Sequence, residues 1–159
     1  MDVYTLSEDN VRAALNDFNH LLKVIEHHPR KRDLGSKIRK GAREILTYLW
    51  TGGLLPTLTY YLAKSEENTL KNIKNVFNKE KREQLFENLD KLAYAIILYF
   101  TLKRLKETNI ISSELDNPRK CLIELLNSSY LKRVYALHLI TSYLLEFKKL
   151  CEATFEAER

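Results

Sequence analysis

One short segment of this 159-residue chain holds the side chains best suited to binding chemistry. The segment 28–50 contains two acidic residues, Asp33 and Glu44, and seven basic ones: Arg30, Lys31, Arg32, Lys37, Arg39, Lys40 and Arg43. The whole chain has 26 Lys and Arg against 21 Asp and Glu, so the segment carries the entire net charge of +5. Crowded cations repel one another, and a phosphate backbone relieves that repulsion while releasing its counterions. We interpret the segment as a candidate polyanion-binding site.

A helix must position these cations. After a basic connector over residues 30–35, we expect Ser36 to cap a helix that runs to about Trp50. At about 100° per residue, one arc of this helix holds Ile38, Ala42, Ile45, Leu46 and Leu49, and the other holds Lys37, Arg39, Lys40 and Arg43. No aromatic residue lies among the cations, so contacts to a nucleic-acid backbone are expected rather than base stacking. The alternative is a solvated helix face whose charges are answered by acids elsewhere in the fold.

Helical periodicity extends over the rest of the chain. Apolar residues recur at helical spacing over 8–26, where Ser7 is the expected N-cap, and again over 55–64, 70–77, 79–106, 118–127 and 130–156. No alternating run is long enough for a strand. The chain is therefore predicted to be an all-α, single-domain bundle of six or seven helices over residues 1–159.

Two local features of this bundle bear on its surface. Gly52 and Gly53 can adopt positive φ and end a helix, and Pro56 suits the first turn of the next, which predicts a sharp corner. The last helix carries a second apolar stripe of Leu131, Tyr135, His138 and Leu145. The stripe favours a helix packed from both sides; the alternative is a face left for a partner protein.

Other residue types suggest little chemistry. His20, His27 and His28 lack additional ligands at metal-binding spacing, and Cys121 and Cys151 stand alone, so we expect no metal and no cofactor. No nucleophile elbow or phosphate-cradling glycine loop is present, which favours a binding protein over an enzyme. The longest apolar run, 92–102, has about half of the roughly 20 residues that span a bilayer. We expect a cytoplasmic protein without a membrane segment.

Arg133 and His138 form one pattern with catalytic potential. An arginine followed by four residues and a histidine resembles the active-site motif of HEPN ribonucleases, which are small and helical. The resemblance implies proton transfer by His138 and stabilisation of phosphorane charge by Arg133. Those enzymes usually carry a polar residue after the arginine, whereas this chain has Val134. A metal-independent ribonuclease is the alternative function.

A second resemblance covers roughly half of the chain. The stretch SKIRKGAREILTYLWTGGLLPTLTYYLAKS (36–65) resembles the small helical subunit of Cmr (type III-B CRISPR) effector complexes, in which a basic helix leads into an apolar glycine–leucine turn. The matching positions at the turn are Gly53, Leu54, Thr57, Leu58 and Lys64, and those near the C-terminus are Phe147, Lys148, Lys149, Cys151, Glu152 and Ala153. Gly52 and Pro56 depart from the pattern. The small subunit of Csm-type complexes is a close competitor.

This resemblance implies a non-catalytic backbone subunit. Its partners would be other Cmr-type subunits, further copies of itself, and the crRNA with its target RNA. The RNA-binding residues would then be Lys37, Arg39, Lys40 and Arg43, with Arg30, Lys31, Arg32, Lys148 and Lys149 as further contributors. The hypothesis depends on cations that are not neutralised by carboxylates of the same molecule.

Overall fold

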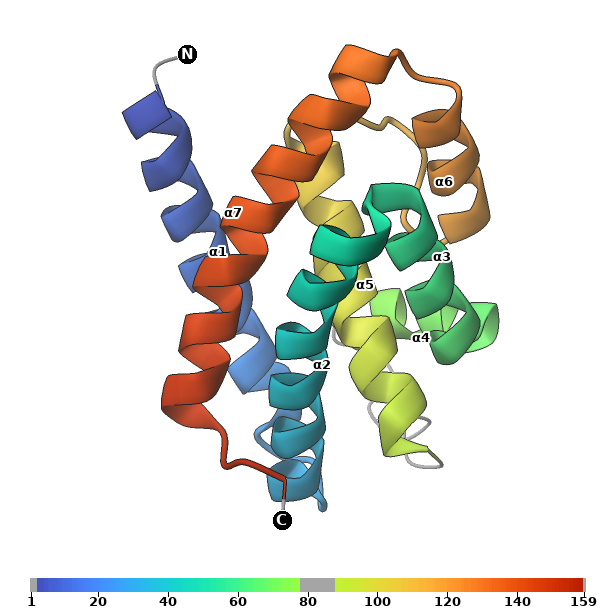
Figure 1. The fold of residues 1–159 in the computed structure, drawn as a ribbon. Coiled ribbons are helices and arrows are strands. Elements are labelled where there is room, and N and C mark those ends of the chain that lie inside the picture. The colour runs from blue at the N-terminus through green and yellow to red at the C-terminus, as the bar shows by residue number, and fades with distance from the viewer. Residues whose placement is uncertain (1–2, 78–87, 159) are drawn as a thin grey trace.

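The described part of the chain folds into helices (Figure 1). The computed structural model describes residues 3–77 and 88–158, with side chains over 6–73 and 88–158. Within these ranges there is no strand and there are seven helices: α1 Val3–Ile25, α2 Lys31–Gly52, α3 Leu54–Ser65, α4 Glu67–Phe77, α5 Leu89–Glu107, α6 Pro118–Leu126 and α7 Tyr130–Thr154. The all-α prediction is confirmed. Residues 79–87 of the expected long helix lie outside the described residues, and α5 begins at Leu89, where the Asn88 side chain accepts a hydrogen bond from the Lys91 amide (3.1 Å).

The central element is α5, which is buried on nearly all sides between residues 92 and 105. α2, α3 and α4 pack against it, while α7 packs on both α1 and α2. In Figure 1, α7 crosses the front of the bundle diagonally, and the C-terminus lies beside the lower end of α2. This arrangement brings the basic helix next to the last residues of the chain.

The glycine corner forms as predicted between α2 and α3. Gly53 has φ 83°, a value that L side chains rarely adopt, and Pro56 lies in the first turn of α3. Beyond the corner, the buried Tyr61 hydroxyl donates to the Gly41 carbonyl (2.7 Å) and fixes α3 against α2. A Cβ at Gly41 would lie 2.5 Å from Ile97 of α5, so this glycine allows close helix packing.

Two predicted helix starts are wrong. Ser7 is not an N-cap, because α1 already begins at Val3 and Leu6 packs against the core. Ser36 is not one either: α2 begins at Lys31, and the Ser36 hydroxyl donates to the Arg32 carbonyl (3.1 Å) inside the helix. The expected connector over 30–35 is helical because Leu34 is 1% exposed and draws that turn into the core.

The loop between α5 and α6 is held by a single carboxylate. Glu124 accepts hydrogen bonds from the amides and hydroxyls of Ser112 and Ser113, at 2.6 to 3.0 Å. These bonds, chiefly the one from the Ser113 side chain, lower the pKa of Glu124 to about 2. The helix that follows begins as expected, with Asn117 accepting from the Lys120 amide ahead of Pro118.

A buried polar network joins α1, α5 and α7. Asn10 accepts two hydrogen bonds from the Arg104 guanidinium (2.9 and 3.0 Å). Asp17 accepts one from the Tyr143 hydroxyl and one from Lys103, both at 2.6 Å. The Asp17 side chain is only 5% exposed. We call these five residues the inner polar network; it was not predicted, because its partners come from helices far apart in the sequence.

Candidate nucleic-acid interface

The predicted cations do gather along one side of α2, but they differ in exposure. We define the basic face as Lys37, Lys40 and Arg43, whose side chains are 23%, 57% and 61% exposed. The opposite side of the helix, with Ile38, Ala42 and Ile45 fully buried, faces the core as expected. Helical periodicity therefore placed the charged and apolar sides of α2 correctly.

Carboxylates of the same chain contact every cation of the basic face. Lys37 Nζ lies 2.7 Å from Asp90 and 3.2 Å from Glu158, and the other Glu158 oxygen lies 3.2 Å from Lys40. Arg43 pairs with Glu152 at 3.4 Å. The hydrogen bond to Asp90 is the largest influence raising the pKa of Lys37, and hydrogen bonds from Lys37 and Lys40 lower the pKa of Glu158. Acids elsewhere in the fold thus contact these cations, as the alternative weighed from the sequence requires, and their binding to RNA stays a prediction.

Arg39 has a different environment from its neighbours. It is half-buried, and its Nη1 donates to the carbonyls of Glu152 (3.3 Å) and Phe155 (2.8 Å) at the end of α7. A cation at a helix C-terminus satisfies carbonyls that have no intrahelical partner and interacts favourably with the helix dipole. Arg39 thus stabilises the end of α7 rather than projecting freely from the basic face.

The other cations predicted to contribute to RNA binding also form ion pairs, with one exception among the described residues. Arg30 pairs with Asp33 (3.2 Å), Arg32 with Glu156, Lys148 with Glu152 (3.9 Å) and Lys149 with Glu146 (2.9 Å). Lys31 is exposed and makes no ion pair with any residue whose side chain is described. Seven of the nine candidate cations therefore meet six carboxylates. All nine exceed these carboxylates by three charges, or by two when Glu44 of α2 is counted.

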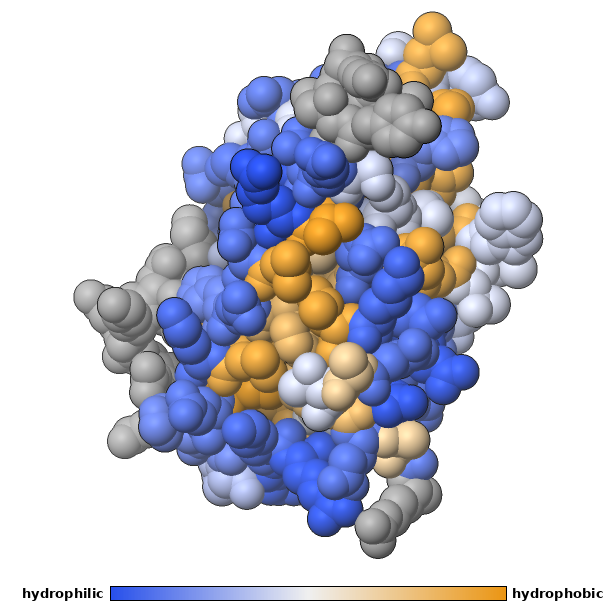
Figure 2. All heavy atoms as spheres, turned by 90° about the vertical axis from the view of Figure 1, so that its left-hand side faces the viewer, coloured by the Kyte–Doolittle hydropathy of each residue, from blue (hydrophilic) through white to orange (hydrophobic). Residues whose placement is uncertain are grey.

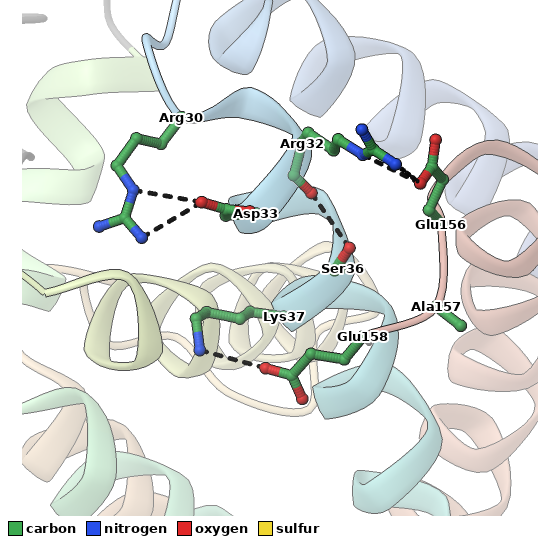
Figure 3. Close-up of a pocket in the computed structure, with 8 residues that line it drawn as sticks. All are labelled: Arg30, Arg32, Asp33, Ser36, Lys37, Glu156, Ala157 and Glu158. Carbon is green, nitrogen blue, oxygen red and sulfur yellow. Dashed lines mark hydrogen bonds and ion pairs between the residues drawn. The ribbon is translucent and has the colours of Figure 1, made fainter.

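Two open hollows lie along this surface. One, of about 470 Å³, is lined by the start of α2 and residues 156–158, and Figure 3 shows Arg32 and Lys37 reaching across it to Glu156 and Glu158. The other, of about 570 Å³, is lined by Arg39, Lys40, Arg43 and Lys148 together with Ala157 and Glu158. Basic side chains thus border both hollows, and Ala157 and Glu158 line both.

Arg133 and His138, the residues of the ribonuclease alternative, lie in different environments. Arg133 Nη1 donates to the carbonyls of Leu126 (3.0 Å) and Ser128 (2.5 Å), where it closes the C-terminal end of α6. His138 is exposed on the outer side of α7. The guanidinium thus has a structural role in the turn between the two helices.

The second apolar stripe of α7 is exposed. Leu131, Tyr135 and Leu145 are 78%, 43% and 40% exposed, and Val11 and Leu15 of α1 are 36% and 43% exposed. Figure 2 views the side on which α1 and α7 lie, and an apolar band crosses that face. The helix that is packed on nearly all sides is α5, so our preferred interpretation of α7 was wrong. The alternative, a face left for a partner protein, stays a prediction.

Other site types are not found in the described part of the chain. No group of three or more His, Cys, Asp or Glu side chains there could hold a metal ion. Among the same residues, no helix is long and apolar enough to cross a bilayer. Cys121 and Cys151 are buried free thiols, and burial raises the pKa of the Cys121 thiol to about 11.

Comparison with known proteins gives the family context. No family model matches the chain. A curated protein of Saccharolobus solfataricus, the CRISPR system CMR subunit Cmr5, is 26% identical over 153 residues, which cover 94% of this chain and 95% of that protein. The chain is a distant relative of this Cmr subunit. The match confirms the resemblance drawn from residues 36–65 and the C-terminal segment, and extends it from about half of the chain to nearly all of it.

Proposed function

We propose that this protein is a non-catalytic assembly subunit of a Cmr-type, type III-B CRISPR effector complex in the cytoplasm. The likeness to Cmr5 over 94% of the chain carries the proposal. Its partners are other Cmr-type subunits, the crRNA and the target RNA. Two surfaces are available for these partners, the basic face of α2 and the apolar stripe of α7.

The basic face is the proposed RNA contact. Lys40 and Arg43 are more than half exposed, and exposed ion pairs contribute only about 0–1 kcal/mol each; Lys37 is 23% exposed. Phosphates can therefore replace the carboxylates, with counterion release favouring the exchange. Lys31, exposed at the start of α2, adds a further cation along the same helix.

The apolar stripe of α7 is the proposed protein contact. Leu131 and Tyr135 lie about one helical turn apart and Leu145 about three turns further on, all on the side of α7 opposite its buried residues. Apolar side chains left open in this way are typical of subunit interfaces. We propose that another subunit of the complex, or a further copy of this chain, covers them.

The RNA contact is tested by removing charge without reversing it. The triple variant Lys37→Gln, Lys40→Gln, Arg43→Gln should retain less RNA in the assembled complex. The slope of the logarithm of the RNA-binding constant against the logarithm of the salt concentration should become shallower by about 0.7–0.9 for each phosphate that is no longer neutralised. The matched control, Lys23→Gln, Arg119→Gln, Lys132→Gln, removes the same charge from exposed positions elsewhere. Equal RNA retention by both variants, with assembly intact, would overturn the RNA contact.

Assembly is tested separately by affinity purification of the tagged chain from its own cells. We expect larger Cmr-type proteins and short RNA to be recovered with it. Purification of the chain alone at native expression levels would contradict the proposal. The double variant Leu131→Ser, Leu145→Ser, at exposed positions, should lower the recovery of the partner proteins while the chain stays folded.

A further inference from the structure

The last described residues, 155–158, cross from the end of α7 to α2 and place two carboxylates on its cations (Figures 1 and 3). We propose that this segment, which we call the acidic strap, occupies the phosphate positions of the basic face and is exchanged for the RNA backbone on binding. The proposal rests on the RNA contact proposed above and concerns how that contact is regulated.

One end of the strap is fixed. Phe155 is 9% exposed, its ring centroid lies 5.6 Å from that of Phe18, and its amide donates to the Cys151 carbonyl (2.8 Å). A Cβ on Gly35 would lie 2.6 Å from the Phe155 ring, so the ring lies directly on the backbone of α2. Arg39 holds the Phe155 carbonyl from the other side. This buried anchor keeps the strap beside α2 whatever happens to the residues beyond it.

The other end is held only by side chains. Within the described chain, residues 156–158 make no backbone–backbone hydrogen bond, and Ala157 is exposed. Glu156 pairs with Arg32, and these two side chains are 59% and 62% exposed. Exposed ion pairs are weak and are screened by salt. The strap beyond Phe155 can therefore leave α2 without disturbing the core.

The strap resembles a short polyanion in its contacts. Its carboxylates, two residues apart, reach Arg32, Lys37 and Lys40 over two turns of α2. Further cations line the two hollows that meet at Ala157, Arg30 in one and Arg39, Arg43 and Lys148 in the other. A phosphate backbone laid along α2 would meet the same groups, and a phosphate and a strap carboxylate cannot occupy the same position beside them. Competition between carboxylate and phosphate follows from this shared position.

Binding of the full-length chain to fluorescein-labelled polyuridylate tests the competition. The variant Glu156→Gln, Glu158→Gln should bind about threefold to tenfold more tightly than the unmodified chain, because two exposed anions no longer compete. The control Glu67→Gln, Glu114→Gln makes the same change in net charge on α4 and before α6. The proposal is wrong if both variants bind polyuridylate more tightly to the same extent, or if the strap variant binds it no more tightly than the unmodified chain.

Backbone relaxation measured by NMR tests the exchange directly. On addition of polyuridylate, order parameters at 156–158 should fall from about 0.85 to below about 0.6, while that of Phe155 stays high. RNA binding with residues 156–158 still rigid would overturn the strap. If the Lys37, Lys40, Arg43 triple variant loses binding while the strap variants behave as the unmodified chain, the strap alone is wrong. If the triple variant binds normally, the RNA contact itself fails, and with it the strap.

Discussion

Two clusters of charged side chains in this molecule use similar contacts in opposite surroundings. In the inner polar network, Lys103 meets Asp17 at 2.6 Å, and the Asp17 side chain is 5% exposed. On the basic face, Lys40 meets Glu158 at 3.2 Å, with side chains 57% and 39% exposed. The first cluster joins three helices inside the bundle, and the second joins a helix to a short extended segment on the surface.

The difference in burial decides what each cluster can do. Water does not solvate a buried charge, so removal of its partner leaves an uncompensated ion in the core. An exposed charge exchanges one anion for another at little cost. The inner polar network is therefore suited to holding α1, α5 and α7 in one arrangement, whereas the basic face is suited to binding and release.

The largest expected effect is the removal of a buried carboxylate. Asp17→Ala should lower the free energy of unfolding by about 3 kcal/mol, because the fully buried Tyr143 hydroxyl would lose its acceptor and Lys103, which keeps Glu107, would lose one of its two carboxylates. Asp33→Ala, which breaks the exposed pair with Arg30, should cost at most about 1 kcal/mol. Urea denaturation of the two variants measures both values. Similar decreases would remove the distinction between the two clusters.

The next largest effect is expected at the anchor of the strap. Gly35→Ala places a Cβ 2.6 Å from the Phe155 ring and should destabilise the chain by about 1–3 kcal/mol through overpacking. Gly52→Ala, at a helical position with no atom within 4 Å, is the matched control and should be neutral or slightly stabilising. Thermal unfolding compares the two. A neutral Gly35→Ala would show that Phe155 is not held against α2.

A smaller effect is expected in alkali, at the inner polar network. Burial disfavours the charged form of Lys103, but its hydrogen bonds to Asp17 and Glu107 outweigh this and raise its pKa above 10.5. Stability from this group is thus fully present below pH 10.5 and is lost as the pH rises through the folded pKa. Urea denaturation at a series of pH values above 10.5 should show the free energy of unfolding of the unmodified chain decreasing. A Lys103→Met variant should show less of it.

The smallest effect is expected in acid, at the strap. Hydrogen bonds from Lys37 and Lys40 lower the pKa of Glu158 below 4.5, so its contribution is present above pH 4.5 and is lost as the pH falls through the folded pKa. Asp90 also faces Lys37, with its carboxylate 2.7 Å from Lys37 Nζ. Amide relaxation at residues 156–158 should show release of the strap in acid. Glu158→Gln should abolish that transition. If this variant shows the same transition as the unmodified chain, protonation of another group causes it.

Much of the fold was predictable because it depends on residues that are close together in the sequence. The period of the apolar residues gave the helices, and Gly53 marked the corner, because only a positive φ allows that turn. The position of the cations on α2 followed from the same periodicity. The starts of α1 and α2 were missed because packing by Leu6 and Leu34 overrides the local capping signals.

The partners of the charges were not predictable. Arg32 and Glu156 lie 124 positions apart, and Tyr143 and Asp17 lie 126 apart, so nothing local links them. The stripe of Leu131 and Leu145 likewise has the same sequence pattern whether it is covered or open.

By itself, the sequence determined that this protein is helical, that its excess positive charge lies on one side of one helix, and where that helix ends, since each of these depends on residues within a few turns of one another. Only the tertiary structure decided which charges are buried, which carboxylate meets which cation, and which apolar stripe stays exposed. Those outcomes depend on how helices far apart in the chain pack together, and that packing sets both the distance between two charges and the amount of water around them.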